Sequence, residues 1–258
     1  MSATTVPLAR IVAAETKAEC IKIARLPRFV IPTLAFPMLF YAMFGIALNR
    51  GGAAGPVSVS TYMLATYGTF GVLGAALSGL GIGIATERGQ GWFTLKRASP
   101  MPPLAYVLAK TIMSMLFSAV IVLLLFAMGA ALGNVHMSPA SWITLFATLV
   151  LGAVPFAALG CALGFAVGPN SAPALINLVY LPMSFTAGLW LPIEMMPHFF
   201  RVIAPLLPPF HIARLALHAV GADSSEVLPH VLALVFFTAL FTAFAAWAYR
   251  RDEDKTYG

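Results

Sequence analysis

Long apolar runs separated by short polar segments constrain this chain more than any other feature of its sequence. A run of about 20 apolar residues is long enough for a helix to cross the hydrocarbon core of a bilayer, which is about 30 Å thick. Charged residues make up only 9% of the sequence, whereas soluble domains carry about a quarter. Because so few charges cannot cover a water-exposed surface, we expect an all-α integral membrane protein whose apolar surface faces lipid.

The apolar runs predict six transmembrane helices within a single domain, residues 1–258. The expected spans are about 29–48, 61–85, 105–132, 141–167, 174–190 and 228–249. The segment before them, 1–28, mixes charged and apolar residues and predicts an interfacial helix, although two glutamates interrupt its apolar face. Segment 49–60 is rich in glycine and predicts a loop. Segment 191–227 predicts an outer re-entrant hairpin of two short helices divided by prolines.

The distribution of Lys and Arg predicts the orientation. Segments 1–28 and 86–104 and the C-terminal tail together carry eleven of these residues, whereas the opposite side carries only Arg50, Arg201 and Arg214. Because cytoplasmic segments of membrane proteins are enriched in basic residues, we expect both termini to be cytoplasmic. Lys110, just inside the third span, is expected to snorkel to the headgroups. The net charge of +6 therefore reflects membrane topology and does not indicate nucleic-acid binding.

Two series of small residues predict close helix packing, because small side chains let two helices approach each other. They are Gly71, Ala75, Gly79 and Gly83 in the second span, and Gly160, Gly164 and Gly168 at the end of the fourth.

The motifs of common enzymes are absent from the sequence. It has no phosphate-binding loop of the form G-x-x-x-x-G-K-S/T, no H-E-x-x-H and no G-x-S-x-G. We therefore expect no catalytic residue, metal or cofactor in this chain, and a transporter of this kind would take its energy from a partner. One alternative is an intramembrane lipid-modifying enzyme that uses His136, His198, His211 or His218, with the last three on polar stripes facing water or headgroups. Another is a structural or assembly protein.

One polar segment carries a resemblance to a known family. Glu87-Arg88, Gly91, Leu95, Ser99-Pro100 and Lys110 resemble the pattern E-R-x-x-G-T-L-x-x-L-x-x-S/T-P, followed by a lysine, between spans two and three of permeases in the type-2 ABC exporter superfamily. Residues downstream resemble the fifth span of that family and the stretch after it: Asn177, Pro182, Phe185, Gly188, Pro192, Met196-Pro197 and Pro205. The segment GQGWFTLKRASPMPPLAYVLAK is most similar to the antibiotic and multidrug efflux branch. Trp92-Phe93 and Lys96-Arg97 depart from the common pattern.

The resemblance implies an ATP-driven exporter of a hydrophobic or amphipathic substrate in the bacterial plasma (inner) membrane, with polysaccharide or lipid-linked glycan export as the alternative. It implies a homodimer of this chain, or a heterodimer with a related chain, bound to two ABC ATPase subunits, which would hold ATP and Mg. Segment 86–104 would be the cytoplasmic coupling loop. The coupling residues would be Glu87, Arg88, Gly91, Trp92, Phe93, Leu95, Lys96, Arg97 and Pro100. The candidate residues of a substrate path are Tyr41, Phe44, Tyr67, Phe70, Asn177, Phe185 and Trp190.

Overall fold

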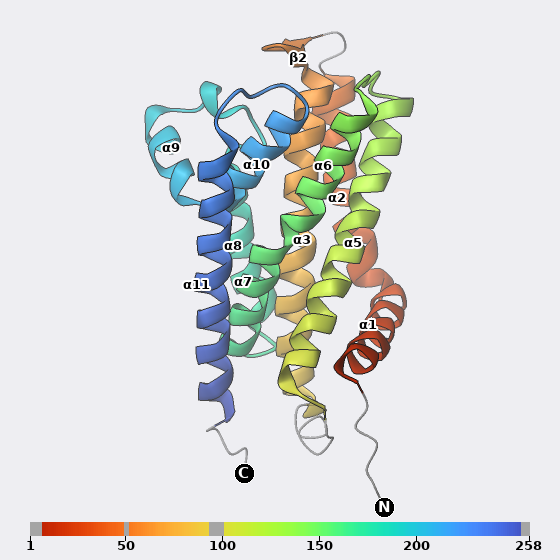
Figure 1. Cartoon of the computed structure of the whole chain (residues 1–258), viewed down its shortest axis with the longest axis vertical. Coiled ribbons are helices and arrows are strands. Elements are labelled where there is room, and N and C mark those ends of the chain that lie inside the picture. The colour runs from red at the N-terminus through yellow and green to blue at the C-terminus, as the bar shows by residue number, and fades with distance from the viewer. Residues whose placement is uncertain (1–6, 49–51, 93–100, 254–258) are drawn as a thin grey trace, which may run out of the picture.

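The computed structural model of the protein describes residues 7–48, 52–92 and 101–253. They form a bundle of helices with a long vertical axis (Figure 1). Helix α1, the last turns of α3 and α11 and the first turn of α5 lie at one end, which we call the terminal end. The small strands and the α9–α10 hairpin lie at the other, which we call the hairpin end.

The first half of the chain contributes the central helix and its neighbours. Its elements are α1 (Leu8–Ala24), α2 (Pro27–Phe40), a π-helical continuation (Tyr41–Ala47), β1 (Ala53–Ala54), β2 (Val57–Ser58), α3 (Val59–Gly89) and α5 (Pro103–Ala131). β1 and β2 pair as an antiparallel hairpin within the segment expected to be a loop. α3 begins two residues before the expected span, because the Ser58 side chain accepts a hydrogen bond from the backbone N–H of Thr61 and caps the helix.

The second half of the chain contributes the remaining helices. They are α6 (Pro139–Leu151), α7 (Ala153–Ala166), α8 (Ala172–Thr186), a 3-10 turn (Ile193–Met195), α9 (His198–Ile203), a second 3-10 turn (Ala204–Leu206), α10 (Pro208–Ala219) and α11 (Val227–Glu253). α6 and α7 together make one candidate span, Pro139–Ala166.

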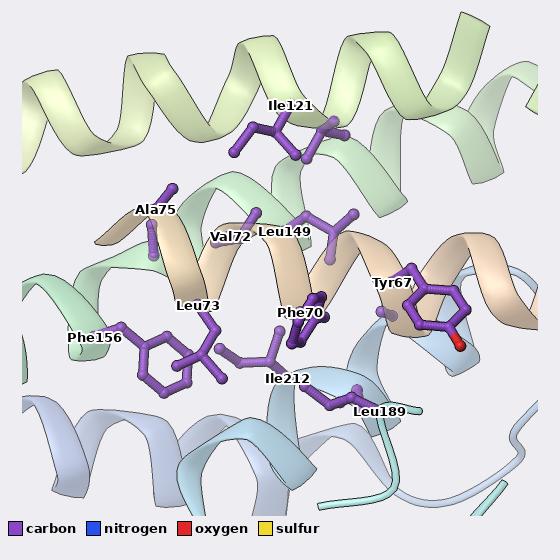
Figure 2. Close-up of a cluster of buried hydrophobic side chains, with 14 of the residues drawn as sticks. Tyr67, Phe70, Val72, Leu73, Ala75, Ile121, Leu149, Phe156, Leu189 and Ile212 are labelled. Carbon is purple, nitrogen blue, oxygen red and sulfur yellow. The ribbon is translucent and has the colours of Figure 1, made fainter. Parts of the chain in front are cut away.

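Helix α3 is the centre of the bundle. In its most apolar stretch 78% of the residues are buried, whereas in α11 the share is 6%. Figure 2 shows side chains from several elements gathered around α3, among them Ile121 of α5, Phe156 of α7 and Ile212 of α10. α11 therefore presents its apolar surface to the bilayer, while α3 is enclosed by the rest of the chain.

The all-α membrane fold is confirmed. Among the described residues five helices are long and apolar enough to cross a membrane, or six if the pair α9–α10, bent by 94°, is taken as one broken span. The expected fifth span, 174–190, is different: α8 ends at Thr186 and has only 15 residues. At 1.5 Å per residue it extends about 22 Å, which is short of a hydrocarbon core of about 30 Å.

The predicted glycine packing is correct at some positions and wrong at others. A Cβ atom added at Gly164 would lie 2.8 Å from the carbonyl oxygen of Gly81 in α3, so α7 and α3 touch through their backbones here. Gly168 meets only a distant serine oxygen, and Gly83 has open space around it. The periodicity alone does not reveal which face of a central helix another backbone approaches.

Candidate coupling site at the terminal end

Glu87 and Arg88 lie on the last turn of α3, although the sequence analysis placed them in a loop. Consecutive residues of a helix point in different directions, and these two side chains bind different partners. Glu87 reaches α1 and α5, whereas Arg88 reaches the end of α7. Glu87 is only 5% exposed. The start of the polar segment 86–104 is therefore part of the helical bundle.

The carboxylate of Glu87 accepts hydrogen bonds from three side chains. Its Oε1 accepts from Lys110 Nζ at 2.9 Å and from Lys22 Nζ, and its Oε2 accepts from the Tyr106 hydroxyl at 2.6 Å. Lys110 is 1% exposed. The expectation that Lys110 snorkels to the headgroups is therefore wrong, because its ammonium group points into the protein, where carboxylates neutralise it.

A second carboxylate completes the arrangement. Glu19 Oε2 accepts from Lys110 Nζ at 2.9 Å and from Lys22 Nζ at 3.4 Å. We call Glu19, Lys22, Glu87 and Lys110 the four-charge cluster, which holds two positive and two negative charges. The cluster explains why Glu19 interrupts the apolar face of α1: this side chain is buried and ties α1 to α5.

The charges of the cluster are mutually dependent. Burial on its own lowers the pKa of Lys22, but the carboxylates of Glu87 and Glu19 outweigh burial and leave this pKa above its ordinary value. Lys22 is therefore charged at neutral pH. Buried charges are tolerated when each has a partner, and removing one partner leaves the other uncompensated.

Arg88 fixes the other side of the same helical turn. Its Nη1 donates to the carbonyl oxygens of Gly164 at 2.9 Å and Val167 at 3.0 Å. These carbonyls belong to the C-terminal end of α7, where the helix has unpaired acceptors and a partial negative charge. Next to it, a Cβ at Gly89 would lie 2.6 Å from the side chain of Pro169. The last turn of α3 is thus joined to α1, α5, α7 and the turn after α7.

The chain becomes exposed directly after this anchored turn. Gly91 has a φ of +74°, a left-handed conformation that glycine adopts without strain, and it turns the chain away from α3. Trp92 follows and is 52% exposed. Phe93, Leu95, Lys96, Arg97 and Pro100 lie outside the described residues. The coupling role of these residues, and of Glu87 and Arg88, stays a prediction.

Five candidates for the substrate path come together in one aromatic cluster. Tyr67 donates from its hydroxyl to the carbonyl oxygen of Trp190 at 3.2 Å, and the ring of Trp190 lies 6.0 Å from that of Phe185. Phe44 and Phe70 also contact the ring of Tyr67. The cluster is completed by further rings: Phe36, Phe40, Tyr180 and Phe200.

Two candidates lie elsewhere. The Tyr41 hydroxyl bonds to Ser60 at 2.8 Å and lies beside Gly129 of α5. Asn177 is exposed on α8. The aromatic cluster joins α2, α3 and α8 to the start of the hairpin. These contacts between distant segments could not be predicted from the sequence.

The four histidines of the enzyme alternative differ in their exposure. His136, His198 and His218 are exposed, whereas His211 is buried. On the expected polar stripe of α10, His211 is therefore buried and only His218 is exposed, with Arg214 between them partly exposed. His211 contacts His230, a residue that the sequence analysis did not single out. No group of three or more metal-binding side chains occurs within the described part of the chain.

Comparisons with known proteins extend over most of the chain. The family described as "ABC-2 family transporter protein" matches residues 54–247. The curated protein "Putative transport permease YvfS" of Bacillus subtilis (strain 168) is 28% identical over 236 residues, which cover 92% of this chain and 96% of that protein. The family match begins at the β-hairpin and includes α3, α5 and α7, three of the helices that contribute to the candidate coupling site.

Proposed function

Because the chain belongs to the ABC-2 family of transporter proteins, we propose that it exports a hydrophobic or amphipathic substrate with energy delivered at its terminal end by a separate ABC ATPase. The family match supports the coarser statement, that the chain is the membrane subunit of an ABC transporter and works with an ABC ATPase. ATP and Mg would bind to that partner, since this sequence lacks a phosphate-binding loop.

One observation carries the proposal: the exposed Gly91–Trp92 segment follows a helical turn that is fixed to four neighbours. Glu87 holds this turn to α1 and α5, and Arg88 holds it to α7. A displacement of the turn is therefore passed to several helices at once and is not absorbed by a flexible loop. Closure of the ATPase subunits around ATP would supply the push.

Charge and the arrangement of the bundle support the proposed orientation. The basic residues counted in the sequence lie mainly in segments that reach the terminal end, and cytoplasmic segments are enriched in such residues. α1 and the last turn of α11 lie at this end in Figure 1. We place both termini in the cytoplasm of a bacterial cell, and we propose a homodimer of this chain with two ATPase subunits.

A variant at Trp92 can test docking of the ATPase without disturbing the fold. Replacing Trp92 by alanine is expected to weaken ATPase binding about tenfold or more, because aromatic anchors at interfaces commonly contribute about 2 kcal/mol. The unfolding temperature should stay unchanged, because the side chain is 52% exposed. Binding of the purified ATPase and its stimulation by the permease would measure the effect.

The matched control is Trp247→Ala on α11, where the tryptophan is 51% exposed. This variant is expected to bind and stimulate the ATPase like the wild type. Equal behaviour of the two variants would contradict docking at Gly91–Trp92.

The aromatic cluster supports the proposed substrate class, because flat rings bind apolar and amphipathic molecules. Phe44→Ala is expected to raise the substrate concentration that half-maximally stimulates ATP hydrolysis about three- to tenfold, as the loss of one aromatic contact predicts. Phe236→Ala, on the exposed face of α11, is the control and should leave this concentration unchanged. An equal response of both variants would place the substrate path elsewhere.

A further inference from the structure

Two imidazole rings join α10 to α11 near the hairpin end. Nδ1 of His211 and Nδ1 of His230 lie 2.9 Å apart, and the ring centroids are 5.2 Å apart. His211 is buried and His230 is half-buried. The pair lies at the opposite end of the bundle from the coupling site, and the proposed function gives it no role.

The neighbours of the pair determine where its hydrogens lie. His211 Nε2 is 2.9 Å from the carbonyl oxygen of Pro205. A carbonyl oxygen only accepts, so this nitrogen carries a hydrogen. The contact between the two Nδ1 atoms then requires one hydrogen, which belongs to either ring. His211 thereby connects the turn after α9 with α11.

The other side of His230 faces a serine and an aspartate. Its Nε2 lies 3.4 Å from Ser225 Oγ, and the Ser225 hydroxyl donates to Asp223 Oδ2 at 2.8 Å. Because the only hydroxyl hydrogen of Ser225 is used in that bond, the contact with His230 is made by a hydrogen on Nε2. A pair that carries one positive charge can therefore form all of these bonds.

A second positive charge breaks the pair. With both rings fully protonated, two N–H groups would point at each other across 2.9 Å and two cations would be in contact. The singly charged pair makes the direct bond together with both Nε2 bonds. The neutral pair makes the direct bond only when the hydrogen of His230 lies on Nδ1, and it then loses the bond from Nε2 to Ser225. The doubly charged pair loses the direct bond. Two titrating groups this close take up their protons in coupled steps.

Of the charged groups around the pair, Asp223 favours a positive charge on His230 and Arg214 opposes it. Burial alone raises the pKa of Asp223, but hydrogen bonds from Ser225 and the charge of Arg214 outweigh burial and lower this pKa, so Asp223 stays negative where histidine titrates. Arg214 also bonds to Glu194 at 3.2 Å. From α3, Tyr62 lies within electrostatic reach of these three groups. α6, which also packs on α10, has no titratable side chain.

Within the hairpin, α10 is packed on α3, α6 and α11, and most of its residues are buried. By contrast, no residue of α9 is buried, and α9 leads through a short 3-10 turn into α10. We propose that His211 and His230 form a one-proton latch that holds the α9 part of the hairpin near α11 and releases it when acidification adds a second proton to the pair. The surface at the hairpin end then responds to pH independently of the ATPase.

Spin labels on α9 and α11 test the latch. Phe199→Cys and Leu232→Cys, both at exposed positions, are introduced into the full chain in lipid nanodiscs after replacement of Cys20 and Cys161. The distance distribution is expected to be narrow at about pH 8 and to gain a longer population, about tenfold larger, at about pH 5. A distribution that is the same at both pH values would overturn the proposal.

Histidine substitutions provide the matched comparison. His230→Ala is expected to show the longer population at both pH values. His218→Ala, which changes an exposed histidine on α10, should behave like the wild type. Nitrogen-15 NMR of labelled histidine in the wild-type chain gives a second measurement, which does not depend on whether a variant folds. His211 and His230 should titrate in coupled steps, and titration of each in a single independent step would overturn the latch.

Discussion

Replacing Glu87 by glutamine is expected to destabilise the folded chain by about 3–5 kcal/mol, because it leaves a buried positive charge without its partner. The four-charge cluster is neutral as it stands, and Lys110 within it is 1% exposed. Without the Glu87 carboxylate, Lys22 and Lys110 would share Glu19 alone. Thermal unfolding of the purified chain in one detergent would measure the loss.

A double variant tests whether the charges act as a cluster. Lys110→Met is expected to cost a similar amount alone, but the double variant Glu87→Gln with Lys110→Met should lose clearly less than the sum, since Glu19 and Lys22 can still pair. Glu226→Gln changes an exposed glutamate and should shift stability by no more than about 0.5 kcal/mol. If the Glu87 and Glu226 variants unfold at the same temperature, the cluster does not stabilise the fold.

Replacing Gly164 by alanine is expected to destabilise the bundle by about 1–3 kcal/mol, the usual effect of overpacking. The new methyl group would lie 2.8 Å from the Gly81 carbonyl oxygen and 2.9 Å from Ile84 Cβ, and neither backbone nor Cβ atoms can move aside without shifting a helix. α7 and α3 would have to separate along the contact that Arg88 closes at its end. Unfolding temperature and the yield of monodisperse protein would show the change.

The matched variant is Gly83→Ala in α3, where a Cβ meets nothing within 4 Å. Alanine lowers the conformational entropy of the unfolded chain, so this variant should be unchanged or more stable by about 0.5–1 kcal/mol. An equal loss in both variants would mean that the close approach of α7 to α3 is not what Gly164 provides.

The membrane fold could be predicted from the sequence because lipid imposes one simple requirement, a long apolar helix. The same pattern could not predict where a helix stops short and the protein around it takes over the contacts of the missing turns. α8 ends at Thr186 and a non-helical stretch follows. This stretch is tolerated because Leu189 and Trp190 within it are packed in the bundle. A hydropathy pattern measures how apolar a segment is, and it does not measure where its helix ends.

The candidate coupling site was suggested by the sequence, but its contacts could not be predicted. The E-R pattern placed Glu87 and Arg88 in the loop that follows the second span, whereas they lie on the last turn of α3 and their partners are up to 79 residues away in the chain. The signals were present in retrospect: a glutamate on the apolar face of α1 and a lysine just inside the third span. Each is a charged residue in an apolar setting, which is unusual when it has no partner. In the fold they neutralise each other as a buried ion pair. The His211–His230 contact, 19 residues apart, had no comparable signal.

The most direct test of the account is the environment of position 92 in the working transporter. A photo-crosslinking amino acid in place of Trp92 would be introduced into cells that express the chain with its ABC ATPase. The account predicts a crosslink to the ATPase, together with protection of a cysteine at this position from a membrane-impermeant reagent added outside intact cells. Labelling of that cysteine from outside, in cells that still transport, would contradict the orientation, the docking surface and the export function together.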